Sequence, residues 1–395
     1  MLPLGDSPNP PGTPVATYAL IAANVALYLL VTLPLSARAP DPNDPMVLEY
    51  LRVIAHEMGG LPREAIASLS VYDLFVFRHG YQPGDPSVVD LFFSMFLHGG
   101  LMHLFGNMLF LWIYGDNVEH RLGAIPYVIA YLATGVAATM FFSIFSPDSR
   151  IPMVGASGAI SGVLGCYFVW FPHNKVRVLL IFGFFVDVVM LPARVLLGIY
   201  LFLENVVPFL VARSSTGVAY GAHIGGFIAG WVLAKWLDRR VVIEPPSEYR
   251  KLAPVGEIPT ERDRATEIRE AIRERRLEDA ANAYFRLREA DTRGVLGSEE
   301  ALELGAWLAS NAHPEAAAVV YRRLIREAPS GPLSARARVA LGEILLNELR
   351  QPAAAYQYLV DALDLAPPPD VAARAHELLD AIAGMQKLKL GTLRR

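Results

Sequence analysis

The sequence predicts an all-α protein in two parts, a polytopic bundle of six transmembrane helices followed by a soluble α-helical repeat domain. Apolar runs long enough to cross a bilayer recur up to about residue 240. Charge is concentrated after that point, since only 11 of the 35 Lys and Arg and 15 of the 39 Asp and Glu lie up to Asp238. We therefore expect a membrane domain at 1–240, a Pro-containing linker at 241–259 and a soluble domain at 260–395.

The predicted spans follow from runs of about 20 mostly apolar residues, the length that crosses the hydrocarbon core as a helix. They lie near 16–35, 100–118, 124–146, 157–171, 195–212 and 222–237. A further apolar run at 176–191 is shorter and carries Asp187, so it is either a seventh span or a segment that is re-entrant or lies at the membrane interface.

Two small-residue motifs carry the first chemical signal. Ser157 lies in Gly155-Ala-Ser-Gly158, and His223 lies in Gly-Ala-His-Ile-Gly-Gly, each at the start of a predicted span. Ionisable and polar side chains are costly at membrane depth, and small neighbours let helices approach closely. This pairing predicts a serine nucleophile with a histidine base that takes its proton and returns it to the leaving amine.

That pairing also fixes the topology. Ser157 and His223 can meet only if their spans start on the same face, which requires one crossing between them and makes 176–191 re-entrant or interfacial. Both termini then share one face, which the positive-inside rule makes cytoplasmic. The basic residues on that face are Arg121, Lys175, Arg177, Lys235, Arg239 and Arg240. We expect a multi-pass protein of a bacterial inner membrane.

Further polar residues gather in the second span. His103 and Asn107 are four apart and share a helix face, and His98 precedes them where the loop enters the helix. Acyl transfer needs donors where the substrate carbonyl oxygen becomes negative. The Asn107 amide, the His103 ring and the backbone N–H of Ser157 can supply them. No intramembrane carboxylate occupies an obvious third position beside the histidine, and Asp187 and Glu204 are weak candidates.

Simpler interpretations exist for each motif. The glycines and Ser157 could serve helix packing alone, and His103 with Asn107 could be a polar pair that joins helices. A metal site that includes His98 is disfavoured because no carboxylate or thiol joins the histidines at ligand spacing. The three features together favour catalysis over packing. Neither half is basic enough to indicate nucleic-acid binding, and the single Cys166 excludes an intramolecular disulfide.

These motifs together resemble the rhomboid family of intramembrane serine proteases, over residues 16–237. His98, His103 and Asn107 match its H-x4-H-x3-N pattern, Gly155 to Gly158 match its G-x-S-G, and Ala222-His223 match its last core helix. The resemblance implies a six-helix bundle with a hydrophilic cavity open to the extracytoplasmic side and no metal or organic cofactor. It implies Ser157 as nucleophile, His223 as base, His103 and Asn107 as oxyanion stabilisers, and His98 as a supporting residue.

The chain departs from the family pattern in two places. Members often carry an aromatic residue one turn after the nucleophile, against which the imidazole packs, whereas this chain has Ser161. The resemblance therefore leaves the orientation of His223 open. Many members also have a Trp-Arg pair in the first loop, but no tryptophan precedes Trp112 here.

A polar site within the bilayer needs a movable segment that admits water and substrate. Span five contains Glu204, Asn205 and Pro208, and we hypothesise that it is this mobile gate.

The region after the linker shows an internal repeat. The run from Pro314 to Pro329 recurs thirty-eight residues later from Pro352 to Pro367, and a fainter copy begins at Asp279. Helix-pair repeats with small packing residues are typical of stacked solenoids, and this one loosely resembles tetratricopeptide repeats. The expected role is a cytoplasmic surface that docks a protein partner, and the alternative is a plain helical domain that stabilises or dimerises the chain.

The sequence as a whole therefore predicts a serine endopeptidase that cuts single-span membrane proteins within or near their membrane helices. The first alternative is a catalytically inactive rhomboid-like protein that binds membrane helices and docks partners through its tail. A channel or transporter is disfavoured because the spans show neither inverted halves nor charges along a path.

Overall fold

The computed structural model describes residues 2–10, 12–58, 60, 68–182, 185–211, 219–240, 261–287 and 291–392. The predicted linker at 241–259 lies outside these residues. The chain is mostly helical and divides into two compact units. The first comprises Met1–Asp6 and Gly12–Arg239, and the second comprises Ser7–Pro11 and Arg240–Arg395. Each unit is described by itself.

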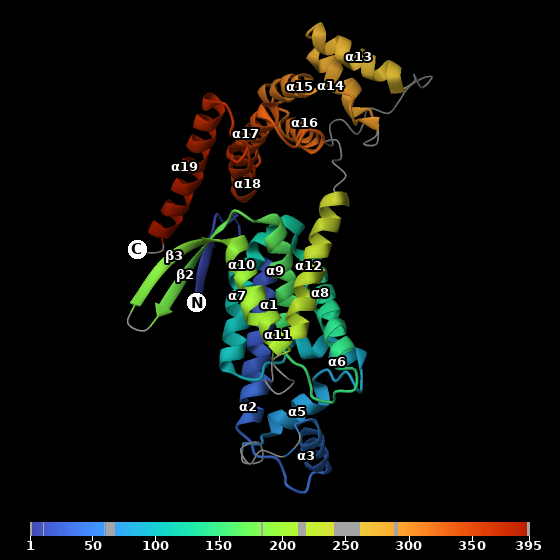
Figure 1. Ribbon diagram of the computed structural model, residues 1–395, viewed down its shortest axis with the longest axis vertical. Coiled ribbons are helices and arrows are strands. Elements are labelled where there is room, and N and C mark those ends of the chain that lie inside the picture. The colour runs from blue at the N-terminus through green and yellow to red at the C-terminus, as the bar shows by residue number, and fades with distance from the viewer. Residues whose placement is uncertain are drawn as a thin grey trace. The chain divides into compact units, whose positions relative to one another are not determined.

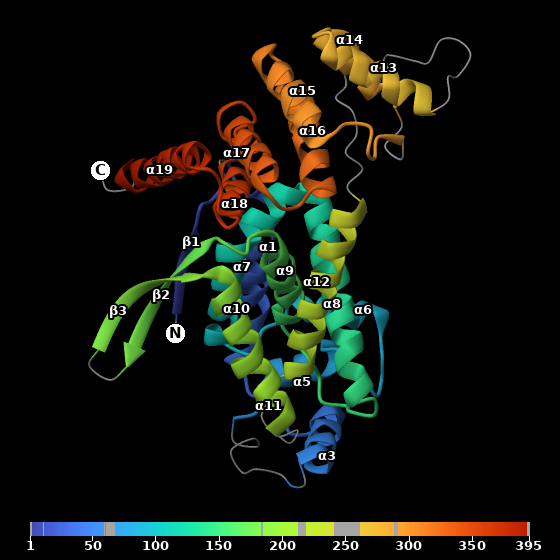
Figure 2. The same ribbon diagram turned by 45° about the horizontal axis from the view of Figure 1, so that its top comes forward.

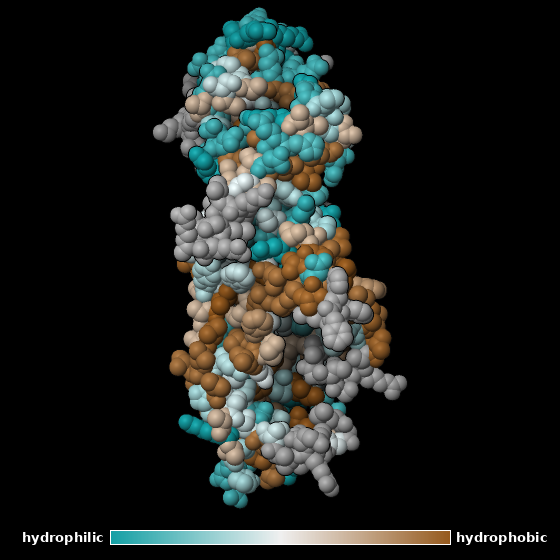
Figure 3. Space-filling view, turned by 90° about the vertical axis from the view of Figure 1, so that its left-hand side faces the viewer, coloured by the Kyte–Doolittle hydropathy of each residue, from teal (hydrophilic) through white to brown (hydrophobic). Residues whose placement is uncertain are grey.

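Helices in the first unit occupy all six ranges where spans are predicted (Figure 1). They are α1 (Val15–Leu27), continued by η1 (Tyr28–Thr32) and α2 (Leu33–Ser36); α7 (Leu101–Leu122); α8 (Ala124–Phe145); α9 (Ser157–Trp170); α10 (Ala193–Leu201), continued by η3 (Phe202–Val206) and α11 (Val207–Val211); and α12 (Tyr220–Arg240). Apolar side chains gather over the helices of this unit on the face that Figure 3 shows. An exposed apolar surface of this kind is typical of helices that face lipid.

Not every helix in this set meets a length-and-composition test for a membrane span. Among the described residues, Val15–Ser36, Ala124–Phe145 and Ala193–Val211 pass it, and α6 (Val88–Phe93) with η2 (Ser94–Phe96) and α7 adds a fourth as a pair bent by 88°. Helix α9 is apolar but only 14 residues long. The count of six spans therefore stays a prediction.

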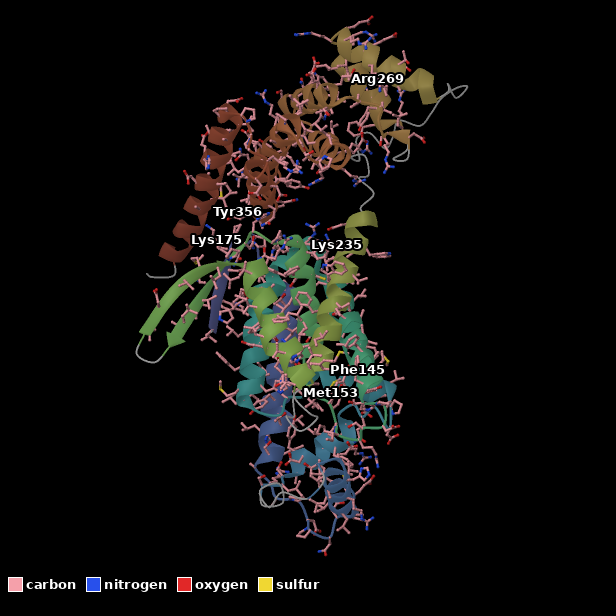
Figure 4. All side chains as sticks on the ribbon, in the orientation of Figure 1. Phe145, Met153, Lys175, Lys235, Arg269 and Tyr356 are labelled. Carbon is pink, nitrogen blue, oxygen red and sulfur yellow. The ribbon has the colours of Figure 1, made fainter. Side chains whose placement is uncertain are left out.

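The two ends of the first unit differ in character. Lys175 and Lys235 lie at one end of the helices, and Phe145 and Met153 lie toward the other (Figure 4). Because α9 and α12 run in the same direction, their first turns meet at the end that bears Met153.

Between the first two predicted spans, α3 (Pro45–Met58), α5 (Val71–His79) and α6 fold as short helices. Helix α5 begins with a capping box, in which the side chains of Ser70 and Asp73 accept hydrogen bonds from each other's backbone N–H.

The expectation of an all-α fold is wrong in one region, which forms a three-stranded sheet with the order β1-β2-β3. Strand β1 is Leu2–Ser7, and the ambiguous run at 176–191 forms the antiparallel hairpin of β2 (Lys175–Phe182) and β3 (Phe185–Pro192) (Figure 2). Lys175 pairs with Pro192, so the segment returns to its starting point and is not a seventh helical span. The period-two alternation of buried Val176 and Val178 around exposed Arg177 is typical of a strand with one covered face.

Glycines set the distance between the helices that carry the serine and the histidine. A Cβ on Gly226 of α12 would lie 2.1 Å from the carbonyl oxygen of Gly158 in α9, and a Cβ on Gly230 would lie 1.9 Å from that of Gly162. On the other face of α9, a Cβ on Gly162 would lie 2.1 Å from Thr134 Oγ1 of α8. Helix α9 therefore contacts the backbone of α12 directly on one face and the Thr134 side chain of α8 on the other, and glycine permits both approaches.

The start of α1 is fixed from another helix. Glu119 of α7 is 5% exposed, and its carboxylate accepts hydrogen bonds from the N–H groups of Ala16 (2.9 Å) and Thr17 (2.7 Å) and from the Thr17 hydroxyl (2.8 Å). These N–H groups have no partner within their own helix, and a negative charge at a helix N-terminus is favourable. Glu119 thus joins α7 to α1.

The second unit contains seven helices among its described residues: α13 (Glu261–Arg273), α14 (Leu277–Phe285), α15 (Ser298–Ser310), α16 (Pro314–Glu327), α17 (Pro332–Asn347), α18 (Pro352–Leu363) and α19 (Pro369–Thr392). Arg275, Ala312 and Arg350 each have positive φ and each lie two residues before the second helix of a pair. Their spacings of 37 and 38 residues match those of the sequence repeat. Small residues pack the pairs, as where a Cβ on Gly305 would lie 2.5 Å from the Tyr321 ring.

Candidate active site

Ser157 and His223 lie in contact, although 66 residues separate them in the sequence. Ser157 begins α9 and His223 lies in the first turn of α12. Ser157 Oγ is 2.8 Å from His223 Nε2, which is hydrogen-bond distance. Both side chains are partly exposed. The pair is therefore a hydroxyl and an imidazole in direct contact, neither of them fully buried.

The other ring nitrogen of His223 defines which tautomer is present. His223 Nδ1 is 2.7 Å from Asn205 Oδ1 in η3. An amide oxygen can only accept, so Nδ1 carries the hydrogen and Nε2 is left to accept the hydrogen of the Ser157 hydroxyl. This is the tautomer that a general base for Ser157 needs.

Asn205 is the site residue that sequence reasoning missed at this position. The carboxylates considered as third members lie elsewhere, because Glu204 is exposed and the exposed Asp187 bonds the backbone N–H of Val188 in β3. Asn205 was noted only as a polar residue of the hypothetical gate. The sequence does show an asparagine within an apolar span, which marks Asn205 as unusual. Its contact with His223 depends on the fold and cannot be inferred from the local sequence.

Gly155 has a conformation and a neighbour that exclude any side chain. Its φ is +126°, and a Cβ there would lie 2.9 Å from both Cε1 and Nε2 of His103 and 3.7 Å from Ser157 Oγ. His103 of α7 therefore packs against the backbone beside Ser157. At Gly158 only a neighbour leaves no room for a side chain, since a Cβ there would lie 2.8 Å from the Ala138 Cβ of α8.

His98 and Asn107 form a buried pair next to this group. His98 is fully buried, its Nε2 is 3.0 Å from Asn107 Nδ2, and its Nδ1 is 3.3 Å from the carbonyl oxygen of Phe96. Nδ1–H donates to that carbonyl and Nε2 accepts from Asn107, so both ring nitrogens are used. Tyr72 of α5 secures the loop, donating from its hydroxyl to the His98 carbonyl at 2.8 Å. Both ring nitrogens of His98 therefore have hydrogen-bond partners, one of which is Asn107.

The amide of Asn107 keeps one hydrogen beyond the one that it gives to His98. The ring of His98 lies 5.1 Å from that of His103, measured between centroids. Helix α9 adds a backbone N–H at Ser157, where helical N–H groups lack intrahelical partners. Three kinds of donor, an amide, an imidazole and a helix N-terminus, thus come from the same end of α7 and α9.

This site and its helices define a multi-pass membrane protein, and residues 85–240 match the rhomboid domain family. The chain is similar to rhomboid protein 1, mitochondrial, of Saccharomyces cerevisiae, with 31% identity over 169 residues that cover 39% of this chain and 44% of the yeast protein. It is also similar to rhomboid protease GluP of Bacillus subtilis, with 32% identity over 143 residues that cover 35% of this chain and 24% of GluP.

A third relative is presenilin-associated rhomboid-like protein A, mitochondrial, of Danio rerio, at 28% identity over 41% of this chain and 42% of that protein. The matched part spans less than half the length of these curated relatives. Together the family match and the names of these relatives support placing the membrane region of the chain in the rhomboid family.

Proposed function

We propose that the chain is an intramembrane serine endopeptidase of a bacterial inner membrane, with both termini in the cytoplasm. The observation that carries the proposal is the 2.8 Å hydrogen bond between Ser157 and His223, in the tautomer that accepts the serine proton. Two helices are held together by glycines so that this bond can form, and a packing role alone requires no such bond.

The reaction follows from this geometry. Ser157 Oγ attacks the substrate carbonyl carbon while its proton passes to His223 Nε2, and the carbonyl oxygen becomes negative. Asn107 Nδ2, the His103 ring and the Ser157 N–H would donate to that oxygen. The imidazolium then gives its proton to the departing amine nitrogen, which leaves an acyl-enzyme. Water attacks the ester, gives its proton to His223, and the proton returns to Ser157 Oγ as the acid leaves.

The proposed substrates are single-span membrane proteins embedded in the same bilayer. A helical segment hides its peptide bonds in hydrogen bonds, so it must unwind before a carbonyl can reach Ser157. Small or helix-breaking residues near the end of the substrate helix lower the cost of this step. We therefore expect cleavage near that end.

A reporter assay tests the proposal. Purified protein in proteoliposomes should cleave a single-span reporter, and the Ser157→Ala and His223→Ala variants should each reduce cleavage to background. Cleavage that survives in either variant refutes the assignment. A wild type that binds the reporter without cutting it would instead favour the inactive, helix-binding alternative.

For the second unit we propose a tetratricopeptide-like docking module with a cytoplasmic protein partner. The support is its series of helical hairpins with the same positive-φ turn at 37- and 38-residue spacing. Photo-crosslinkers on α16 and α18 should capture a discrete partner in cells, and a chain that ends at residue 259 should lose it. Self-crosslinking alone would favour the dimerising alternative.

A further inference from the structure

Asn205 contacts the imidazole of His223 on the side of the ring that faces away from Ser157. The resemblance to rhomboid proteases predicts an aromatic residue beside this ring, but Ser161 occupies that position and is 2% exposed, with its Cβ within 3.2 Å of where a Cβ on Gly226 would lie. The Nδ1 atom of the ring instead makes a 2.7 Å hydrogen bond to Asn205. A ring with only one hydrogen bond could rotate about its Cβ–Cγ bond, whereas a ring with bonds at both nitrogens cannot do so freely.

The amide of Asn205 is itself fixed. Its Nδ2 donates to the carbonyl oxygen of Tyr200 at 3.1 Å, which requires Oδ1 to be the atom that faces His223. The side chain is 1% exposed, while its neighbour Glu204 is exposed. A buried amide with both of its polar atoms engaged resists rotation, because turning it over would break two hydrogen bonds at once.

The backbone around Asn205 has an irregular turn. Residues 202–206 form the π-helical turn η3, in which the N–H of Val207 bonds the carbonyl of Phe202 five residues earlier. A π turn places an extra residue in one turn of helix and so changes which residues face the bundle. Such turns are uncommon and often occur at functional sites. Here the turn coincides with the one buried residue of η3, Asn205.

We propose that Asn205 is a positioning residue for the proton transfers of His223, an inference that rests on the proposed function. By accepting from Nδ1–H, Asn205 keeps Nε2 free to take the Ser157 proton. When Nε2 gains that proton the ring becomes positive, and the Asn205 oxygen then bonds a charged donor, which strengthens the bond. The proton leaves again from Nε2 to the amine, while the Nδ1 hydrogen stays in place throughout.

This arrangement places one member of the site on a third helical segment. Ser157 is on α9 and His223 on α12, whereas Asn205 is on the segment formed by α10, η3 and α11. The orientation of the base therefore depends on where that segment lies. If this segment moved away from α12 by more than about 1 Å, the 2.7 Å distance between His223 Nδ1 and Asn205 Oδ1 would exceed hydrogen-bond length.

The test measures kcat and KM for a single-span reporter in proteoliposomes. Asn205→Leu keeps the side-chain size but removes the acceptor, and kcat should fall about 10- to 100-fold with KM within about twofold of wild type. Asn205→Asp restores an acceptor and should recover most of kcat. Glu204→Gln, an exposed change on the same turn, is the matched control and should leave both constants unaltered.

The pH dependence of kcat separates positioning from mere packing. A carboxylate next to Nδ1 favours the protonated ring, so in Asn205→Asp the acidic limb of the kcat profile should move to higher pH than in wild type. A packing residue would not move this limb. Wild-type kcat in Asn205→Leu, or an unshifted profile in Asn205→Asp, overturns the inference. Should Asn205→Leu fail to fold, the Asn205→Asp profile decides the question alone.

Failure of the inference is distinct from failure of the proposed function. If wild type cleaves, Ser157→Ala does not, and the Asn205 variants match wild type, the protease assignment stands and the role of Asn205 is refuted. If wild type does not cleave the reporter at all, both are refuted.

Discussion

A single methyl group at Gly226 should separate the serine from its base. The Cβ of Gly226→Ala would lie 2.1 Å from the Gly158 carbonyl oxygen, whereas ordinary contact begins at 3.4 Å. Helices α9 and α12 must therefore move apart by about 1.3 Å, the difference between those two distances. If α12 moves as a rigid body along the line of the bond, the 2.8 Å from Ser157 Oγ to His223 Nε2 becomes about 4.1 Å, beyond hydrogen-bond length.

Misplacement of a reacting group by about 1 Å can cost about 100-fold in rate, so kcat for a single-span reporter should fall by about that factor. The assay is cleavage in proteoliposomes, with melting temperature measured in parallel. Gly198→Ala in α10 is the control, because a Cβ there meets nothing within 4 Å. If Gly226→Ala folds and keeps wild-type kcat, backbone contact does not set the geometry of the site.

Three further changes test other parts of the first unit. Gly155→Ala should lower kcat at least as strongly as Gly226→Ala, since it combines a φ of +126° with a clash against His103, and reporter cleavage at wild-type rate would contradict this. Glu119→Gln should destabilise the fold by about 1.5–3 kcal/mol, because charged hydrogen bonds to the start of α1 are lost, and an unchanged unfolding free energy in denaturant titration would argue against that cap. Burial, and to a smaller extent the negative charge of nearby Asp116, raises the pKa of the Asp6 carboxyl in the folded protein well above its usual value. At a pH above the pKa of Asp6 in the unfolded chain, Asp6 therefore destabilises the fold, and this cost fades as the pH falls. Asp6→Asn should therefore melt higher than wild type at pH 8, with a difference that shrinks toward pH 5, and a constant difference would refute the argument.

The helical part of the membrane unit could be predicted from sequence because its signals are local. Apolar runs gave helices within a few residues of the expected bounds, as for α8 at Ala124–Phe145 against a predicted 124–146. The approach of Ser157 to His223 was also predictable, since both lie at helix starts and small residues flank each of them. A chemical requirement, that nucleophile and base meet, supplied the long-range information.

The sheet and Asn205 could not be predicted in the same way. Strand β1, Leu-Pro-Leu-Gly-Asp-Ser, has no clear alternation, and it forms a strand because it pairs with β2. The hairpin was ambiguous because a sixteen-residue apolar run suits a short helix as well as two strands. Asn205 faces His223 only through the π turn of η3, and nothing in the local sequence marks where such a turn falls. The number of spans stays a prediction, as do the repeat class of the second unit and the catalytic roles.

The pairing of β1 with β2 has a consequence for biosynthesis. The two strands are separated by about 170 residues of chain, so β1 cannot complete its edge of the sheet until most of the membrane unit has been translated. Until then Asp6 has no Tyr167 or Asn174 to contact, because both of these partners are synthesised late. Strand β1 can therefore pair only after α7, α8 and α9 have been made, and its pairing marks the stage at which the first four predicted spans are present.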